Sequence, residues 1–156
     1  MSIKNSYPEL PEIKYQHTSV EMPFVVAYAK TLTGIYSADV LKMAYAIFRN
    51  ESGNGAKGIN NNYAGIQADC GRWNNLTGKP VATSIKFDGK AMRRFLCFDE
   101  AGYKVSFETL CIKVEQRQIT TALDYFKKWA GRPGSTIEKQ NFESLLRSAE
   151  KVFSPD

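Results

Sequence analysis

The sequence predicts a mainly helical α+β domain that contains one small β-hairpin. Apolar residues recur every three or four positions in several segments, most clearly in residues 38–51 and 136–153, and this is the spacing of amphipathic helices. An Asp-Gly pair at residues 88–89 separates two β-prone runs, which is typical of a hairpin. With 156 residues, 43% of them hydrophobic, the chain is large enough to fold as one domain with a buried core.

The first 20 residues are polar and contain two prolines, so we expect an extended lead-in to a single domain over residues 21–156. A first helix is expected to begin around Pro23, because proline is tolerated in the first turn, and to end at Gly34. Ser37 is a favourable N-cap for a second helix over residues 38–51. The single histidine, His17, falls in the lead-in, where we expect it to be exposed and not catalytic.

The apolar spacing of the second helix leads to a glutamate. Val40, Ala44 and Ile47 follow one stripe of the helix, and four residues further along the same stripe is Glu51. The pattern therefore points Glu51 in the direction of the core. The alternative is that Glu51 lies past a frayed helix end and is solvated.

A segment rich in glycine and asparagine, residues 53–73, follows the glutamate. Its composition favours turns and left-handed backbone, and a loop of this length is usually functional or disordered. Interspersed large apolar residues favour an ordered loop. Beyond it we expect the hairpin over residues 81–98 and helices over residues 103–117, 119–130 and 136–153, with Leu123 and Ile137 among the inward-facing residues.

The formal net charge of +5 and the pI near 9.1 favour a polyanionic partner, which includes nucleic acid, anionic membrane and anionic cell-wall polymer. The three cysteines have no metal-binding spacing, so we expect no metal and no cofactor. Buried reduced thiols are expected, with one disulfide and a free thiol as the alternative. The amino terminus lacks the apolar run of a signal peptide, and no segment is apolar enough to cross a bilayer. We therefore expect synthesis in the cytoplasm, with any export by another route.

The order of motifs around Glu51 resembles the lysozyme-like superfamily. It is closest in pattern to the bacterial and phage peptidoglycan glucosaminidases, with the lytic transglycosylases next. The specific part of the resemblance runs from Phe48 to Asp69, within a broader match over residues 22–153. The matching segments are Glu51-Ser52-Gly53-Asn54-Gly55, Asn62-Tyr63-Ala64-Gly65-Ile66-Gln67, Phe95 to Phe98, and Trp129-Ala130-Gly131.

The resemblance implies a lysozyme-like fold with a substrate cleft between a helical body and a hairpin lobe. It implies a monomeric protein whose partner is the glycan strand of peptidoglycan, without nucleic acid and without membrane insertion. Such a protein acts on the bacterial cell wall after release or delivery, as a phage endolysin, a virion-borne lysin or a secreted effector.

By the same resemblance, Glu51 is the catalytic acid of a glycosidase. It would protonate the glycosidic oxygen between N-acetylmuramic acid and N-acetylglucosamine. A carboxyl on an apolar helix face is desolvated, which raises its pKa toward neutrality and lets it hold a proton at working pH. The negative partial charge at the helix C-terminus acts in the same direction.

Further site residues follow from the resemblance, each with a structural alternative. Tyr63 would orient the substrate or stabilise the transition state, or else be a core aromatic. Asn62 and Gln67 would bind N-acetyl groups, or else make hydrogen bonds within the loop. Ser52 would orient Glu51 or cap a turn. The aromatic candidates for stacking on sugar rings are Trp73 and Tyr103, with core packing expected for at least one of them.

One position departs from the glucosaminidase pattern. Those enzymes carry a second acid in the hairpin just before the turn, where this sequence has Lys86. Asp88 and Asp69 are the candidate replacements, although an Asp before Gly is usually there for the turn. Without a second acid, the 2-acetamido oxygen or the 6-hydroxyl of the sugar would act as nucleophile.

The departure at Lys86 also favours an alternative function, a glycan-binding or structural module of a phage tail or secretion machine that has lost catalysis. A basic nucleic-acid-binding domain is a third alternative, but the sequence has no recognition helix or aromatic RNA motif to support it. Both the bond cleaved and the choice between hydrolysis and transglycosylation stay open at this point.

Overall fold

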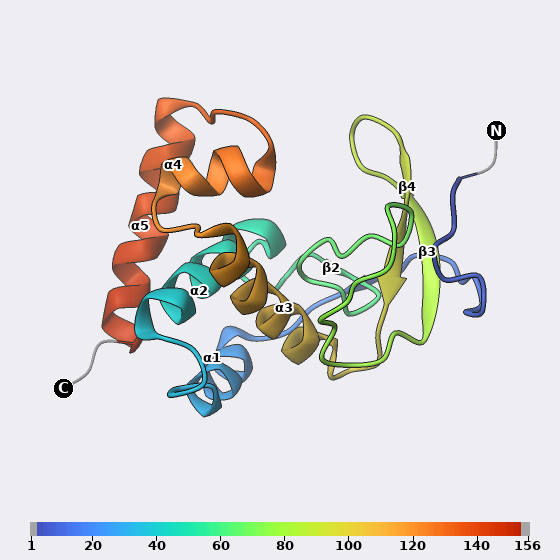
Figure 1. Ribbon diagram of the computed structural model, residues 1–156, viewed down its shortest axis with the longest axis horizontal. Coiled ribbons are helices and arrows are strands. Elements are labelled where there is room, and N and C mark those ends of the chain that lie inside the picture. The colour runs from blue at the N-terminus through green and yellow to red at the C-terminus, as the bar shows by residue number, and fades with distance from the viewer. Residues whose placement is uncertain (1–2, 154–156) are drawn as a thin grey trace.

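The computed structural model describes residues 3–153 and is an α+β fold, with a helical body on one side and a β-hairpin lobe on the other (Figure 1). The elements of the described chain are β1 (His17–Thr18), α1 (Met22–Thr31), α2 (Ala38–Ser52), β2 (Gly58–Ile59), β3 (Ala82–Phe87), β4 (Met92–Cys97), α3 (Gly102–Arg117), α4 (Ala122–Asp124), the π-helical segment η1 (Tyr125–Ala130) and α5 (Thr136–Phe153). Within this range the strands form two antiparallel pairs, β1 with β2 and β3 with β4.

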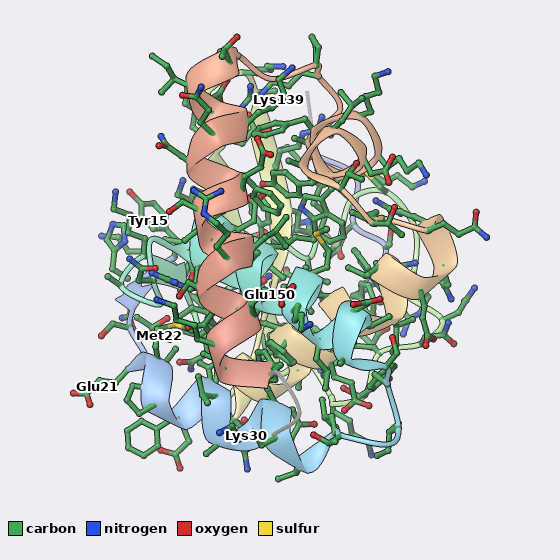
Figure 2. All side chains as sticks on the ribbon, turned by 90° about the vertical axis from the view of Figure 1, so that its left-hand side faces the viewer. Tyr15, Glu21, Met22, Lys30, Lys139 and Glu150 are labelled. Carbon is green, nitrogen blue, oxygen red and sulfur yellow. The ribbon has the colours of Figure 1, made fainter. Side chains whose placement is uncertain are left out.

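Helix α2 is the centre of the helical body. As predicted, the side chain of Ser37 caps its start by accepting a hydrogen bond of 3.2 Å from the backbone N–H of Val40. Gly53 ends the helix in a left-handed conformation, with φ 56°. Residues 43–48 are buried on all sides of the helix because α3 and α5 pack against it. Figure 2 shows α5 in front of α2, with Lys139 and Glu150 along its length.

The hairpin forms where the Asp-Gly pair predicts it. In its register Ser84 lies opposite Phe95, and Lys86 lies opposite Arg93. Cross-strand partners share one face of a sheet, so these four side chains form a common face. The carboxylate of Asp88 closes the turn, because it accepts hydrogen bonds of 2.8 and 3.0 Å from the backbone N–H groups of residues 90 and 91.

The lead-in, described from residue 3 onward, contains a turn closed by a hydrogen bond of 3.0 Å from the N–H of Leu10 to the carbonyl of Tyr7, and it is packed into the fold. Tyr7 is only 4% exposed and belongs to the core. The backbone of Thr83 on β3 is hydrogen-bonded to both Pro11 and Ile13, so the lead-in lies along the outer edge of the hairpin. Further on, β1 pairs with β2 of the loop that follows Glu51. His17, within β1, is exposed.

The predicted helix over residues 119–130 is different in detail. It consists of the short α4 followed by the π-helical segment, where the backbone N–H of Gly131 bonds to the carbonyl of Phe126, five residues earlier. Leu123, predicted inward, is 43% exposed, because the buried stripe passes through Ala122, Tyr125 and Phe126, one position away from the expected one. The prediction that Ile137 faces inward is also wrong. Ile137 lies in the first turn of α5, and its side chain is 69% exposed.

The three cysteines are free thiols. Cys97 and Cys111 are buried as predicted, whereas Cys70 is exposed, which corrects that part of the prediction. The reason is its place in the loop between Gln67 and Trp73, outside the packed body. Across residues 3–153, no helix combines the length and the apolar composition that crossing a bilayer requires.

Candidate functional site

Glu51 lies in the last turn of α2, at a cavity between the helical body and the hairpin lobe. The cavity has a volume of about 190 Å³. The helix contributes the carboxylate, and the hairpin contributes Lys86 and Phe95 from its shared face. The loop between them supplies the rest of the lining, which is Lys57, Ile59, Asn62, Tyr63 and Gly65. Glu51 is the only carboxylate in this lining of described residues.

The predicted desolvation of Glu51 is wrong, because the residue is exposed. Helix α2 extends to Ser52, so fraying of the helix end is not the cause. The cause is that the buried stripe of the helix passes through Ser52 and not through Glu51. The buried residue of the last turn is Ser52, which is 1% exposed and follows the fully buried Phe48 by four positions. Glu51, about 100° away around the helix axis, points to the cavity and not into the core.

Tyr125, from η1 of the helical body, holds the Glu51 carboxylate. Its hydroxyl donates a short hydrogen bond to Oε1 of Glu51 and accepts one of 3.0 Å from the side-chain amide of Asn50. The ring is 2% exposed and is stacked on Phe142, with centroids 4.2 Å apart. Burial, followed by the charge of Glu51, raises the pKa of the Tyr125 hydroxyl, so this group remains a proton donor over the ordinary pH range.

Tyr125 was not among the residues that the sequence predicted for the site. The expected stripe ran through Leu123 and Phe126, whereas the buried residues Ala122, Tyr125 and Phe126 follow the same three- and four-residue spacing one position away from it. The segment η1 begins at Tyr125, and π-helical segments are frequent at functional sites. The pair of adjacent aromatic residues, Tyr125 and Phe126, was the available signal.

Tyr63 lies in the wall of the cavity, below the loop surface. It is 3% exposed and stacks on Phe48 of α2, with ring centroids 5.5 Å apart. Burial raises the pKa of its hydroxyl. Gly58 makes room for the ring, because a Cβ at that position would come within 2.3 Å of it. The structure thus places Tyr63 both in the core and at the site.

The side chains of Ser52 and Asn62 are used within the fold. Ser52 donates to the carbonyl of Phe48 at 2.5 Å and accepts from the N–H of Gly55 at 2.9 Å, so it caps the turn that follows α2. The amide of Asn62 donates to two backbone carbonyls, of Ile66 in the loop and Leu96 in β4, each at 2.9 Å. Its oxygen accepts two backbone N–H groups of the loop. Both residues therefore hold the loop that forms the cavity floor.

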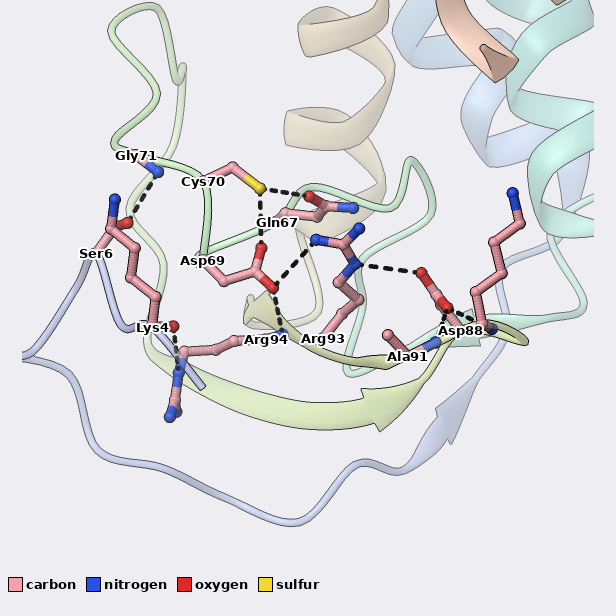
Figure 3. Close-up of polar contacts among 11 residues, drawn as sticks. Lys4, Ser6, Gln67, Asp69, Cys70, Gly71, Asp88, Ala91, Arg93 and Arg94 are labelled. Atoms are coloured by element: carbon pink, nitrogen blue, oxygen red, sulfur yellow. Dashed lines mark hydrogen bonds and ion pairs between the residues drawn. The ribbon is translucent and has the colours of Figure 1, made fainter. Parts of the chain in front are cut away.

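The candidate second acids, Asp69 and Asp88, do not line the cavity of Glu51. Figure 3 shows both of them around Arg93. The side chain of Asp69 is 6% exposed, accepts the N–H of Arg94 at 3.2 Å and lies 3.9 Å from Nη1 of Arg93. Asp88 lies 3.4 Å from Nε of Arg93, and the backbone N–H groups of the turn lower its pKa. Arg93 thus joins the loop to the tip of the hairpin.

Gln67 and Trp73 lie together, but at a second cavity, of about 380 Å³. The indole N–H of Trp73 donates to the carbonyl of Gln67 at 2.8 Å. Tyr103 is half-buried against the core and lines neither cavity. Of the predicted site residues, the structure therefore brings together Glu51, Tyr63 and Asn62.

The chemistry available at the first cavity is proton transfer by one oriented carboxylate, in a lining that also includes Lys57 and Lys86. In the described part of the chain, no group of three or more His, Cys, Asp or Glu side chains is placed to bind a metal ion. Comparison of the chain with protein-family models, curated proteins and solved structures finds no match.

Proposed function

We propose that the protein is a lysozyme-like glycosidase that cleaves the glycan strand of peptidoglycan, with Glu51 as the general acid. The observation that carries the proposal is a single carboxylate at a helix end, held through one oxygen by a buried tyrosine and facing a β-hairpin across a cavity. The other oxygen of Glu51 has no hydrogen-bond partner among residues 3–153 and is available to a substrate. The basic surface supports an anionic wall as the place of action.

The proton on Glu51 must be held without help from the core, because the residue is exposed in the free protein. A glycan strand seated against Tyr63 and Phe95 would cover the carboxyl and remove water from it. Removing water disfavours the charged form of a carboxyl. In this proposal the substrate itself completes the environment in which Glu51 delivers its proton to the glycosidic oxygen.

The cleavage would proceed without a second protein carboxylate. Lys86 lines the cavity at the hairpin position where a glucosaminidase has its second acid, and Asp69 and Asp88 are bound elsewhere. Attack on the anomeric carbon by the 2-acetamido oxygen of the sugar gives hydrolysis through a cyclic intermediate. Attack by the 6-hydroxyl gives the anhydro product of a lytic transglycosylase. Both routes need only one protein carboxyl, which first donates its proton to the leaving oxygen and then accepts one from the attacking water or 6-hydroxyl.

The test is clearing of purified cell walls by the wild type and by Glu51→Gln, which keeps the size of the side chain and removes its acid. Glu143→Gln, an exposed change on α5, is the matched control. We expect clearing by the wild type and the control, and none by Glu51→Gln. Equal clearing by all three would refute the acid assignment. Mass spectrometry of the products identifies the bond from the new reducing end, and a loss of water identifies the transglycosylase route.

A specific observation favours a second candidate function, a glycan-binding module without catalysis. Two lysines, Lys57 and Lys86, line the same small cavity as the only carboxylate there. Ammonium groups can donate hydrogen bonds to a glycan, and binding of this kind needs no proton transfer. Sedimentation with walls separates the two functions: a binding module is retained by the walls and releases no soluble fragments.

A further inference from the structure

The second cavity lies farther along the loop that supplies part of the lining of the first one. It is lined by Gln67, by the loop residues 70–75 and by three residues from the end of α3, Lys113, Gln116 and Arg117. It shares no lining residue with the cavity of Glu51. Its volume of about 380 Å³ is in the range of cavities that bind small ligands.

The positive charge of this cavity is only partly compensated by ion pairs. Arg72, Lys113 and Arg117 line it, and no carboxylate does so. Arg72 is neutralised by Glu9, at 2.6 Å. Among the described residues, neither Lys113 nor Arg117 forms an ion pair, and both come from the same face of α3, four positions apart.

The contacts of these two cations leave donors available. Nζ of Lys113 is 3.2 Å from the amide oxygen of Gln116, and Arg117 donates one hydrogen bond, of 3.2 Å, to the carbonyl of Lys128. Partial burial, and then the charge of Arg117, lower the pKa of Lys113. An anion between the two would relieve that repulsion and accept charge-assisted hydrogen bonds from both.

The remaining lining is suited to a peptide. Side-chain amides of Gln67, Asn74, Asn75 and Gln116 surround the cavity, and an amide offers both a donor and an acceptor to a peptide group. Trp73 forms a rigid wall, fixed by its indole hydrogen bond, with Lys113 Nζ 5.1 Å from the ring centroid. A nucleic acid strand would need a row of cations and free aromatic faces, whereas here each of the two cations without an ion pair lies over a tryptophan ring, Lys113 over Trp73 and Arg117 over Trp129.

We propose that this cavity binds a short peptide through a free carboxylate, which Lys113 and Arg117 receive while the amides of the loop pair with the peptide backbone. This goes beyond the proposed cleavage of glycan. The peptides attached to a peptidoglycan strand carry free carboxylates, so the same polymer would offer a ligand to both cavities. The peptide site itself does not depend on any activity of Glu51.

The test is titration of the 156-residue chain with the synthetic tripeptide Ala-γ-D-Glu-Lys and with its fully amidated form. The readout is the indole N–H resonance of Trp73, assigned by its absence in Trp73→Phe. We expect a saturable shift with the free acid that weakens with salt, and an affinity at least about tenfold lower for the amide. Glu51→Gln should bind like the wild type, so loss of wall clearing and loss of peptide binding are separate results.

The variant that tests the cations is Lys113→Gln with Arg117→Gln. Its matched control is Lys127→Gln with Lys151→Gln, two exposed lysines whose loss gives the same net charge. The first variant should lose peptide affinity at least about tenfold and the control should keep it, with circular dichroism verifying that each is folded. The proposal is overturned if neither peptide binds, if the amide binds equally, or if the two variants behave alike. Tighter binding of a short oligodeoxynucleotide to the same residues would assign the cavity to phosphate instead.

Discussion

Replacing Tyr125 with phenylalanine tests the arrangement that presents Glu51. The change removes one hydroxyl and keeps the ring, so the stack on Phe142 is retained. Two hydrogen bonds are lost, one to the Glu51 carboxylate and one from Asn50. Such bonds contribute about 1.5–3 kcal/mol when one partner is charged and about 0.5–1.5 kcal/mol when both are neutral. Glu51 and Asn50 are exposed and regain water, so we expect a loss of only about 1–2 kcal/mol in the free energy of unfolding.

The assay is equilibrium denaturation of the wild type, Tyr125→Phe and Tyr15→Phe. Tyr15 is 41% exposed, and no hydrogen bond of its hydroxyl is present in the described structure, which makes it the matched control. The control should be neutral within about 0.5 kcal/mol, as expected for a surface change. A Tyr125→Phe protein as stable as the control would refute the contact between Tyr125 and Glu51. If the protein cleaves glycan as proposed, the freed carboxyl should also lower the rate by about 10- to 100-fold, since misplacement of a reacting group has that cost.

The pH dependence of the same variant gives an independent result. The pKa of Tyr125 in the folded state is raised above its ordinary value of 10.0 by burial and by Glu51. The folded protein therefore retains the phenol proton more strongly than the unfolded chain does, and the contribution to stability is complete below pH 10.0. It is lost as the pH rises above that value. Alkaline denaturation should be less steep for Tyr125→Phe than for the wild type, and an unchanged slope would contradict the raised pKa.

Three further outcomes are expected. Asn62→Ala should lower the free energy of unfolding by about 2–4 kcal/mol, because it leaves buried backbone groups of the loop and of β4 without hydrogen-bond partners. Calorimetry or chemical denaturation measures this loss. A neutral effect would show that Asn62 does not hold the loop. In the native protein only the thiol of Cys70 should react with a thiol-specific disulfide reagent, whereas all three thiols should react in denaturant. Reaction of a native Cys70→Ser protein would contradict the burial of Cys97 and Cys111. The hydrogen bond from Arg132 lowers the pKa of Glu138 from 4.5 to about 2, so the pair stabilises the fold above pH 4.5 and this contribution is lost as the pH falls toward 2. Acid denaturation of Glu138→Gln should lack this component, and curves identical to those of the wild type would argue against the pair.

The elements with local signals could be predicted from the sequence. The bounds of α2 follow from the side chain of Ser37 at its start and a left-handed glycine, Gly53, at its end. The hairpin follows from its turn, because the Asp88 carboxylate that closes it acts on its nearest neighbours in the chain. In both cases the residues that determine the structure are adjacent in sequence.

The environment of Glu51 could not be predicted in the same way. Consecutive side chains of a helix differ in direction by about 100°. An apolar stripe that is slightly wide is therefore compatible with burial of either Glu51 or Ser52. The contact with Tyr125 joins residues 74 positions apart, and no local pattern in the sequence encodes it. The second cavity likewise combines a loop with the end of α3, and only tertiary packing brings them together.

The packing of the lead-in along β3 has a consequence for how the protein behaves in solution. At the base of the hairpin, Pro11 and Ile13 are hydrogen-bonded to one edge, and Ile66 and Ala68 to the other, so this part of neither strand offers an open ladder to another molecule. An open strand edge is the usual starting point for intermolecular sheet growth. Removing the first 16 residues would uncover the β3 edge, and a preparation trimmed in this way should associate on concentration while the intact chain stays dispersed.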